Sequence, residues 1–181
     1  MKKIGWLLAA CLGISACDSG SSQADIEQKA RAGDSSAQVE LYRLYHSGQA
    51  RGGSNHAEAM KWLNKAAQGN NAEAQYMLGV IYSSAESGEA KDNNAAAAWF
   101  EKSIENGGKP ALLPAAVFFK NGWGVEKDEV RAFAYLLLAQ QFDNKKAFSQ
   151  DAIFRGALTQ QQRDNSAALA QEIKQKYYPQ P

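Results

Sequence analysis

The chain has 181 residues, of which 45% are apolar and 22% are charged, and its formal net charge is +1. This balance is typical of a folded protein and excludes wholesale disorder. The charge creates no global field that would attract nucleic acid, so we expect no nucleic-acid partner. Because the chain has only two cysteines, a disulfide-rich scaffold is also excluded.

The amino terminus has the pattern of a secretory signal. Lys2 and Lys3 precede an apolar run at positions 4–16, which is 13 residues long. A membrane-spanning helix needs about 20 apolar residues. We therefore predict that residues 1–16 are a signal peptide and not a membrane span.

The end of this apolar run carries a candidate lipidation site. Its last residues, Ile14-Ser15-Ala16-Cys17, resemble the lipobox of bacterial lipoproteins, in which the cysteine carries diacylglycerol. The resemblance implies that Cys17 becomes the first residue of the mature protein and is lipidated. Residues 17–23 would then comprise the lipidated cysteine and a polar tether, and the lipid would anchor the protein to a bacterial membrane in the periplasm.

Two alternatives concern the anchor. Cys11 ends a second short lipobox-like sequence, but the polar stretch that follows Cys17 favours Cys17. An ordinary secreted protein with an incidental cysteine is a weaker interpretation. Asp18 resembles the retention signal of inner-membrane lipoproteins, which favours the inner membrane and leaves the outer membrane open.

The rest of the chain repeats with a period of 37 residues. The pairs at this offset are Ala37 and Ala74, Gln38 and Gln75, Leu41 and Leu78, Tyr45 and Tyr82, Trp62 and Trp99, and Lys65 and Lys102. A third copy keeps the offset through Phe119 and then shortens by one residue, which places Tyr135 where Trp99 stood. A fixed period of this length is the signature of a repeat architecture.

Each repeat is predicted to form two helices. In the second copy, Ala74, Leu78 and Ile81 recur at spacings of three and four, which places them on one helical face. Trp99 and the residues around it continue this pattern on a second helix after a polar loop. The small residue Gly79 allows that second helix to approach closely, so we predict an all-α solenoid.

At these positions the sequence resembles the Sel1-like repeat family, which is related to the tetratricopeptide repeat. The second copy carries the pattern at Ala72-Glu73-Ala74-Gln75-Tyr76, Leu78-Gly79, Tyr82, Gly88, Asp92, Ala96, Trp99-Phe100 and Lys102. The resemblance implies a right-handed α-solenoid of antiparallel helix pairs. It places repeats at about 34–70, 71–107 and 108–142, inside a repeat domain that spans 24–181.

Two residues depart from the repeat pattern. Tyr42 replaces the usual Gly of the first helix, so we expect that helix pair to spread or the ring to turn outward. Pro114 lies about one turn into the first helix of the third repeat, where it removes a backbone hydrogen bond. We expect this helix to start late or to kink.

The ends of the solenoid need capping helices, because a terminal repeat would otherwise expose its apolar face. Residues 24–32 are predicted to form a leading helix, and 143–178 a C-terminal cap that begins with a helix at 145–156. Thr159 and Gln162 form a predicted capping box, which opens a last helix that ends at about Tyr177.

No catalytic pattern is found in the sequence. It has no nucleophile beside a base, no phosphate-binding loop and no metal-binding motif, so we expect no enzyme activity, no cofactor and no metal. His46 and His56 are interpreted as solvated loop residues, and Asp128 as a helix N-cap. Cysteine-rich relatives of this family have been linked to β-lactam hydrolysis or binding, but their cysteine pairs are missing here.

The variable positions of the first helices point to a binding surface on the concave face of the solenoid. The predicted partner-binding residues are Glu40, Tyr42, Arg43, Met77, Ile81, Phe118 and Trp123. Trp123 is predicted either to anchor a partner or to cover Phe119 or the next repeat.

These features favour a membrane-anchored periplasmic module that binds another protein. The resemblance suggests either an adaptor for an envelope complex or an immunity protein that blocks a toxin. A cell-wall or β-lactam enzyme, with Tyr, Glu or His groups of perturbed acidity in one pocket, and a structural spacer remain as alternatives.

Overall fold

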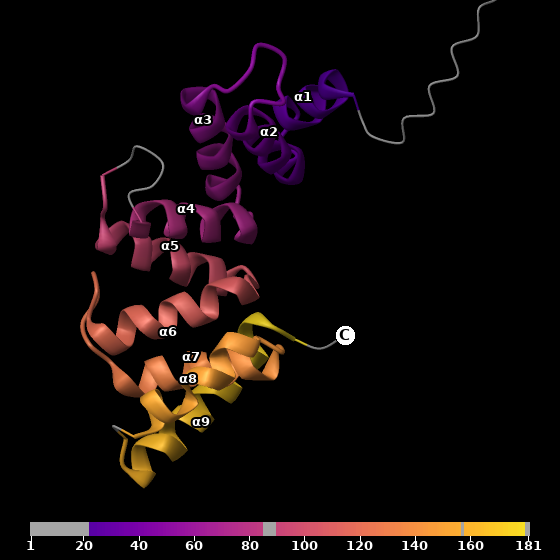
Figure 1. Ribbon diagram of the computed structural model, residues 1–181. Coiled ribbons are helices and arrows are strands. Elements are labelled where there is room, and N and C mark those ends of the chain that lie inside the picture. The colour runs from indigo at the N-terminus through magenta and orange to yellow at the C-terminus, as the bar shows by residue number, and fades with distance from the viewer. Residues whose placement is uncertain (1–21, 85–89, 157, 180–181) are drawn as a thin grey trace, which may run out of the picture.

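The computed structural model describes residues 22–84, 90–156 and 158–179. Within these ranges the chain forms nine α-helices, one short 3-10 helix and no strand. The helices are α1 (Gln23–Arg31), α2 (Ser35–Ser47), α3 (His56–Gln68), α4 (Ala72–Ser84), α5 (Asn93–Glu105), α6 (Leu112–Asn121), α7 (Glu129–Gln141), α8 (Lys145–Arg155) and α9 (Gln160–Tyr177). They stack in chain order from α1 to α8, and α9 packs back against α7 (Figure 1). The predicted all-α solenoid of helix pairs is therefore confirmed.

The predicted signal peptide, Cys11, Cys17 and Asp18 lie outside the described residues. Among the helices that the structure describes, none combines the length and the apolar character that crossing a bilayer requires.

Side-chain caps set the starts of α7 and α9. The Asp128 carboxylate accepts a hydrogen bond from the Arg131 backbone N–H at 2.9 Å, which confirms that Asp128 is the N-cap of α7. Thr159 and Gln162 form the capping box that opens α9, as predicted. Each cap satisfies backbone N–H groups that the first turn of a helix leaves without a partner.

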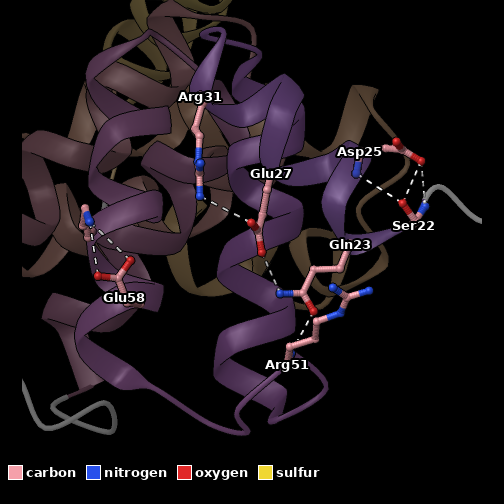
Figure 2. A network of polar contacts seen from close by, with 8 residues as sticks. Ser22, Gln23, Asp25, Glu27, Arg31, Arg51 and Glu58 are labelled. Atoms are coloured by element: carbon pink, nitrogen blue, oxygen red, sulfur yellow. Dashed lines mark hydrogen bonds and ion pairs between the residues drawn. The ribbon is translucent and has the colours of Figure 1, made fainter.

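The leading helix α1 is tied to the loop between α2 and α3. The Gln23 amide donates to Glu27 at 2.8 Å and accepts from the Arg51 backbone N–H at 2.8 Å (Figure 2). On its buried side, Ile26 and Ala30 pack in one apolar cluster with Leu41 and Trp62. As expected, α1 therefore covers the first end of the solenoid.

The two helices within a pair fit through complementary side-chain volumes. A Cβ atom at Gly79 would lie 2.5 Å from two ring carbons of Phe100, so this close approach requires glycine. In the first pair the equivalent positions hold Tyr42 and Leu63. Tyr42 is only 6% exposed and belongs to the same buried cluster as Leu63.

Of the two outcomes expected for Tyr42, a spread helix pair or an outward ring, its burial rules out the outward ring. The ring stacks on His46, with centroids 5.3 Å apart, and lies along the edge of α2 that faces α4. We attribute this placement to Leu63, which occupies the position of Phe100 in the next pair. Because leucine is smaller than phenylalanine, it leaves room for the Tyr42 ring.

Buried glutamines join successive pairs. The Gln38 side chain donates to the Ala30 carbonyl at 2.9 Å, and Gln75 donates to the Ala67 carbonyl at 3.0 Å. Gln75 and Gln38 are 1% and 3% exposed. Each is therefore a buried polar side chain that finds its hydrogen-bond partner in a carbonyl near the end of the preceding helix. Leu112 occupies the equivalent position in the third repeat.

Pro114 delays its helix, as expected. α4 begins at Ala72, and 37 residues later the chain forms a 3-10 helix at Lys109–Ala111 before α6 starts at Leu112. Pro114 then lies in the first turn of α6, where its missing N–H costs no helical hydrogen bond.

The last helices close the other end of the solenoid. α8 follows the predicted range, and α9 packs back against α7. Tyr178, just after α9, is buried with its ring 5.0 Å from that of Phe142. The C-terminal end of α9 also reaches the junction between α5 and α6. A Cβ atom added at Gly107 in this junction would lie 3.8 Å from the Tyr177 carbonyl oxygen.

Candidate partner-binding surface

A small hollow lies between α2 and α4. We call it the Met77 socket, and its volume is about 210 Å³. Its walls include Tyr42 and His46 of α2 and Tyr76, Met77, Val80 and Ile81 of α4. Val80 is 37% exposed and Met77 is half-buried, so apolar side-chain atoms reach the surface here.

The structure brings three of the predicted binding residues together in this socket. Tyr42, Met77 and Ile81 all line it, although Tyr42 and Ile81 are only 6% and 5% exposed. These two residues therefore form its buried walls, while Met77 offers the accessible apolar atoms. Burial raises the pKa of the Tyr42 hydroxyl, and the neighbouring Arg43 lowers it in part, so the phenol is neutral at physiological pH.

Glu40 and Arg43 lie on the exposed side of α2. Arg43 forms an ion pair with Glu73 of α4, and this pair joins the first and second repeats across the surface. Glu40 borders the same hollow as Arg43 and Glu73 and makes no ion pair with any other described residue.

Phe118 is a core residue. It is 6% exposed, and its ring lies 5.3 Å from Phe100 and 5.7 Å from Trp123. The residue is therefore removed from the binding surface that was predicted from the sequence. Phe118 lies on the face of α6 that packs against α5 of the preceding repeat.

Trp123 is 47% exposed, and its ring forms a T-shaped contact with the ring of Phe118. It is therefore available to a partner while it also covers a residue of its own repeat, although the sequence predicted Phe119 in that place. The loop that holds it is well defined, because the Trp123 backbone N–H donates to the Phe118 carbonyl at 3.0 Å. Gly124 packs against the Asn93 backbone, where a Cβ would come within 2.2 Å. Trp123 is thus an exposed aromatic side chain on a fixed loop.

Sequence reasoning missed a second hollow on the other flank of α4. We call it the Pro110 socket, with a volume of about 340 Å³. It is formed by Ala72, Glu73 and Tyr76 of α4 and by Gly107, Gly108, Lys109 and Pro110. Tyr76 lines both sockets. The first and third repeats have Val39 and Leu113 at its position, and this departure was the available signal.

A polar cavity lies between α5, α7 and α9. Glu101, Arg131 and Tyr135 line it, and its volume is about 250 Å³. Burial raises the pKa of the Glu101 carboxyl in spite of the nearby Arg131, and burial followed by the charge of Glu101 raises the pKa of Tyr135. The Arg131 guanidinium lies 3.3 Å from Glu101 and 5.0 Å from the Phe119 ring centroid. We interpret this cluster as an ion pair that joins α5 and α7.

The two histidines are exposed and lie at the helix ends beside the first inter-helix loop, in line with the prediction. Gly48, at a φ of 78°, ends α2 after Ser47, which leaves His46 in the last helical turn, and His56 is the first residue of α3. Within the described residues, no group of three His, Cys, Asp or Glu side chains is arranged to hold a metal ion.

The fold and this surface define a helical repeat protein with exposed apolar hollows on its first helices. The Sel1 repeat family model matches residues 35–71, 72–108 and 115–139. The chain belongs to the Sel1 repeat family, whose members commonly mediate protein–protein interaction. No curated protein matches the chain.

Solved structures agree with this assignment. A Sel1 repeat protein from Oxalobacter formigenes is 34% identical, with a TM-score of 0.67, and the match covers 71% of this chain and 95% of that one. A protective antigen of uropathogenic Escherichia coli, c5321, is 24% identical with a TM-score of 0.63, over 87% of this chain and 41% of that one. Helicobacter pylori cysteine rich protein B is 20% identical with a TM-score of 0.52, over 72% and 97%. The last two likenesses show the fold alone.

Proposed function

We propose that this protein is a membrane-anchored periplasmic module that binds a partner protein on the surface formed by α2 and α4. The observation that carries the proposal is the Met77 socket. Sites that enclose a free small molecule usually measure about 300–1,000 Å³, whereas this socket measures about 210 Å³. It therefore suits one apolar side chain of a partner.

The composition of the socket supports this use. Met and Tyr are enriched at protein interfaces, and a methionine side chain can adapt its shape to the group that it contacts. Trp123 offers a second exposed aromatic group at the third repeat. Two possible roles follow from such a surface, namely an adaptor in an envelope complex and an immunity or inhibitor protein that blocks a periplasmic toxin.

The anchor in this proposal is a lipid on Cys17, followed by a polar tether that the sequence places at 17–23. The helical domain begins at the end of this stretch, since Ser22 caps α1 and Gln23 is its first residue. Asp18 favours the inner membrane as the site of anchoring. Cys17→Ser should abolish fatty-acid labelling and membrane fractionation, and Cys11→Ser is the matched control that should leave both unchanged. Labelling that survives in Cys17→Ser would contradict this assignment.

Photo-crosslinking in cells tests the binding surface. A photoreactive amino acid replaces Val80, which is exposed in the socket, or Ala98, which is exposed on α5. We expect one discrete protein adduct from position 80 and none from position 98. The adduct should diminish when Met77→Asp or Trp123→Ala is added. Equal adducts from both positions, or no discrete adduct from position 80, would argue against the proposal.

A further inference from the structure

We infer that the outer face of α8 binds the anionic phospholipid surface of a bilayer. Among the large apolar side chains of the described residues, Phe148 and Ile153 are the most exposed, at 57% and 63%. The inner side of α8 is buried at Ala147 and Phe154, and α9 packs back against α7, which leaves the outer face of α8 uncovered. The inference goes beyond the proposed function, since it does not depend on the sockets and its test leaves out the Cys17 lipid.

This outer face has an apolar sector that is bounded by basic residues. At about 100° per residue, Phe148 and Ile153 lie about 140° apart around the helix axis, with the small side chain of Ala152 between them. Lys146 precedes Ile153 by seven positions and Arg155 follows Phe148 by seven, which places each about 20° outside the sector. Helices in the membrane interface have this pattern, because Lys and Arg at the edges extend to the lipid headgroups.

The charges of α8 favour an anionic surface. Its exposed side chains include three basic groups and no acidic one, namely Lys145, Lys146 and Arg155. Arg155 is paired with the half-buried Asp151 at 3.0 Å, so the helix carries two net positive charges. Asp143, in the turn before α8, is offset by Lys120 of α6, whose ammonium lies 5.3 Å from the centroid of the Phe154 ring. This end of the solenoid therefore complements a negatively charged surface.

Lys145 and Lys146 also lie at the end of α8 where the helix dipole disfavours them. They are its first two residues, and the partial positive charge of a helix N-terminus favours acidic side chains there. Neither lysine forms an ion pair with another described residue. Lipid phosphate groups would relieve this repulsion, and each lysine near an anionic bilayer strengthens binding by about fivefold.

The size of the face favours a bilayer over a partner protein or a second copy of the chain. α8 has 11 residues, so it is about 16 Å long and about 10 Å wide, and its outer face has an area of roughly 200 Å². A stable protein interface buries about 800 Å² on each partner. A second copy would also bring the basic side chains of two α8 helices together. A bilayer needs no such area, because a weak contact adds to the effect of a lipid anchor.

Vesicle binding tests the inference with residues 17–181 carrying Cys17→Ser, a chain that has no lipid and keeps every described helix. Co-sedimentation should show at least about tenfold tighter binding to vesicles with about 30% phosphatidylglycerol in phosphatidylcholine than to pure phosphatidylcholine, since two lysines contribute about fivefold each. Sodium chloride at about 0.5 M should weaken this binding, because it screens the charges.

Apolar variants assign the contact to α8. Replacing Phe148 and Ile153 together by serine should weaken binding to the phosphatidylglycerol vesicles at least about tenfold, because both side chains then leave the interface. Val80→Ser is the matched control, since it removes an exposed apolar side chain from α4, and it should bind like the parent chain. Circular dichroism should show that both variants fold.

Charge variants make the same assignment through the lysines. Lys145→Glu combined with Lys146→Glu should weaken binding at least about tenfold. Lys29→Glu combined with Arg31→Glu makes the same change of net charge at exposed positions of α1. This control should stay within about twofold of the parent chain, because long-range charge effects are screened.

A fluorescent label shows which face meets the lipid. The chain has two cysteines, and neither remains in residues 17–181 with Cys17→Ser. Ser149→Cys or Ser47→Cys therefore places a single environment-sensitive dye at an exposed position of α8 or α2. Phosphatidylglycerol vesicles should shift the emission to shorter wavelengths at position 149 and leave it unchanged at position 47.

The inference fails if no binding to phosphatidylglycerol vesicles is measurable, if the double serine variant binds like the parent chain, or if both dyes respond alike. A dimer that forms without vesicles and is lost in the double serine variant would also contradict it, since a second copy would then cover α8. A discrete protein adduct from a photoreactive residue at position 149 in cells would contradict it in favour of a partner protein. In each case, the adduct from position 80 still tests the proposed function separately.

Discussion

Gly79 of α4 lies against the ring of Phe100 of α5, so closely that an added Cβ would come within 2.5 Å of two ring carbons. Phe100 is 1% exposed, and its ring also contacts the rings of Tyr76 and Phe118. The contact fixes how the two helices of the second repeat approach each other. The same contact therefore supports α4, on which both sockets lie.

Gly79→Ala should destabilise the protein. Overpacking a core costs about 1–3 kcal/mol, which exceeds the roughly 1 kcal/mol that alanine gains over glycine in a helix. In a Phe100→Leu background the ring is gone, so the same substitution should become neutral or stabilising. Denaturant unfolding of the four proteins in this cycle measures the coupling. An equal cost of Gly79→Ala in both backgrounds would show that Phe100 is not the obstacle.

Gln75→Leu should destabilise the junction between the first and second repeats. It removes the amide that donates to the Ala67 carbonyl at 3.0 Å and the oxygen that accepts from Asn106 at 3.1 Å. The Ala67 carbonyl keeps the Asn70 backbone N–H at 3.2 Å, and the Asn106 amide keeps the Lys102 carbonyl at 2.9 Å. The variant therefore loses two hydrogen bonds, each worth about 0.5–1.5 kcal/mol. The exposed Gln68→Leu on α3 is the control and should change the free energy of unfolding by less than about 0.5 kcal/mol. Similar small changes for both variants would contradict the proposed role of Gln75.

Glu101 should make stability depend on pH. Burial raises the pKa of its carboxyl in the folded state above the ordinary value of 4.5, so the folded state favours the protonated form. The protonated Glu101 carboxyl therefore contributes to the free energy of unfolding. This contribution is fully present below pH 4.5 and is lost as the pH rises through the folded-state pKa of Glu101. Wild type should therefore lose stability relative to Glu101→Gln over this range. A difference that stays constant, or that grows in favour of wild type as the pH rises, would be inconsistent with the raised pKa.

The sequence predicts the repeat and its helices well because these depend on local patterns. The 37-residue period, the N-cap at Asp128, the capping box at Thr159 and the late start before Pro114 all involve groups within one turn or one period of each other. Local spacing was sufficient for each of these features.

The features that were missed depend on contacts between distant segments. The burial of Tyr42 depends on Leu63 in the facing helix, and the Pro110 socket depends on how the turn at 107–110 meets α4. Periodicity likewise does not reveal that α9 returns to α7 and covers Tyr135. Phe118 was assigned to the surface because its position in the repeat is variable, whereas the aromatic rings of Phe100 and Trp123 enclose it.

The most direct test of the central claim is the dissociation constant of the purified helical domain for the partner captured from position 80. Met77→Asp places a carboxylate without a counter-charge in an apolar socket, which should weaken binding at least about a hundredfold. Ala98→Asp should bind like the wild type, and circular dichroism should show that both variants fold. Equal affinity of Met77→Asp and the wild type would contradict the account.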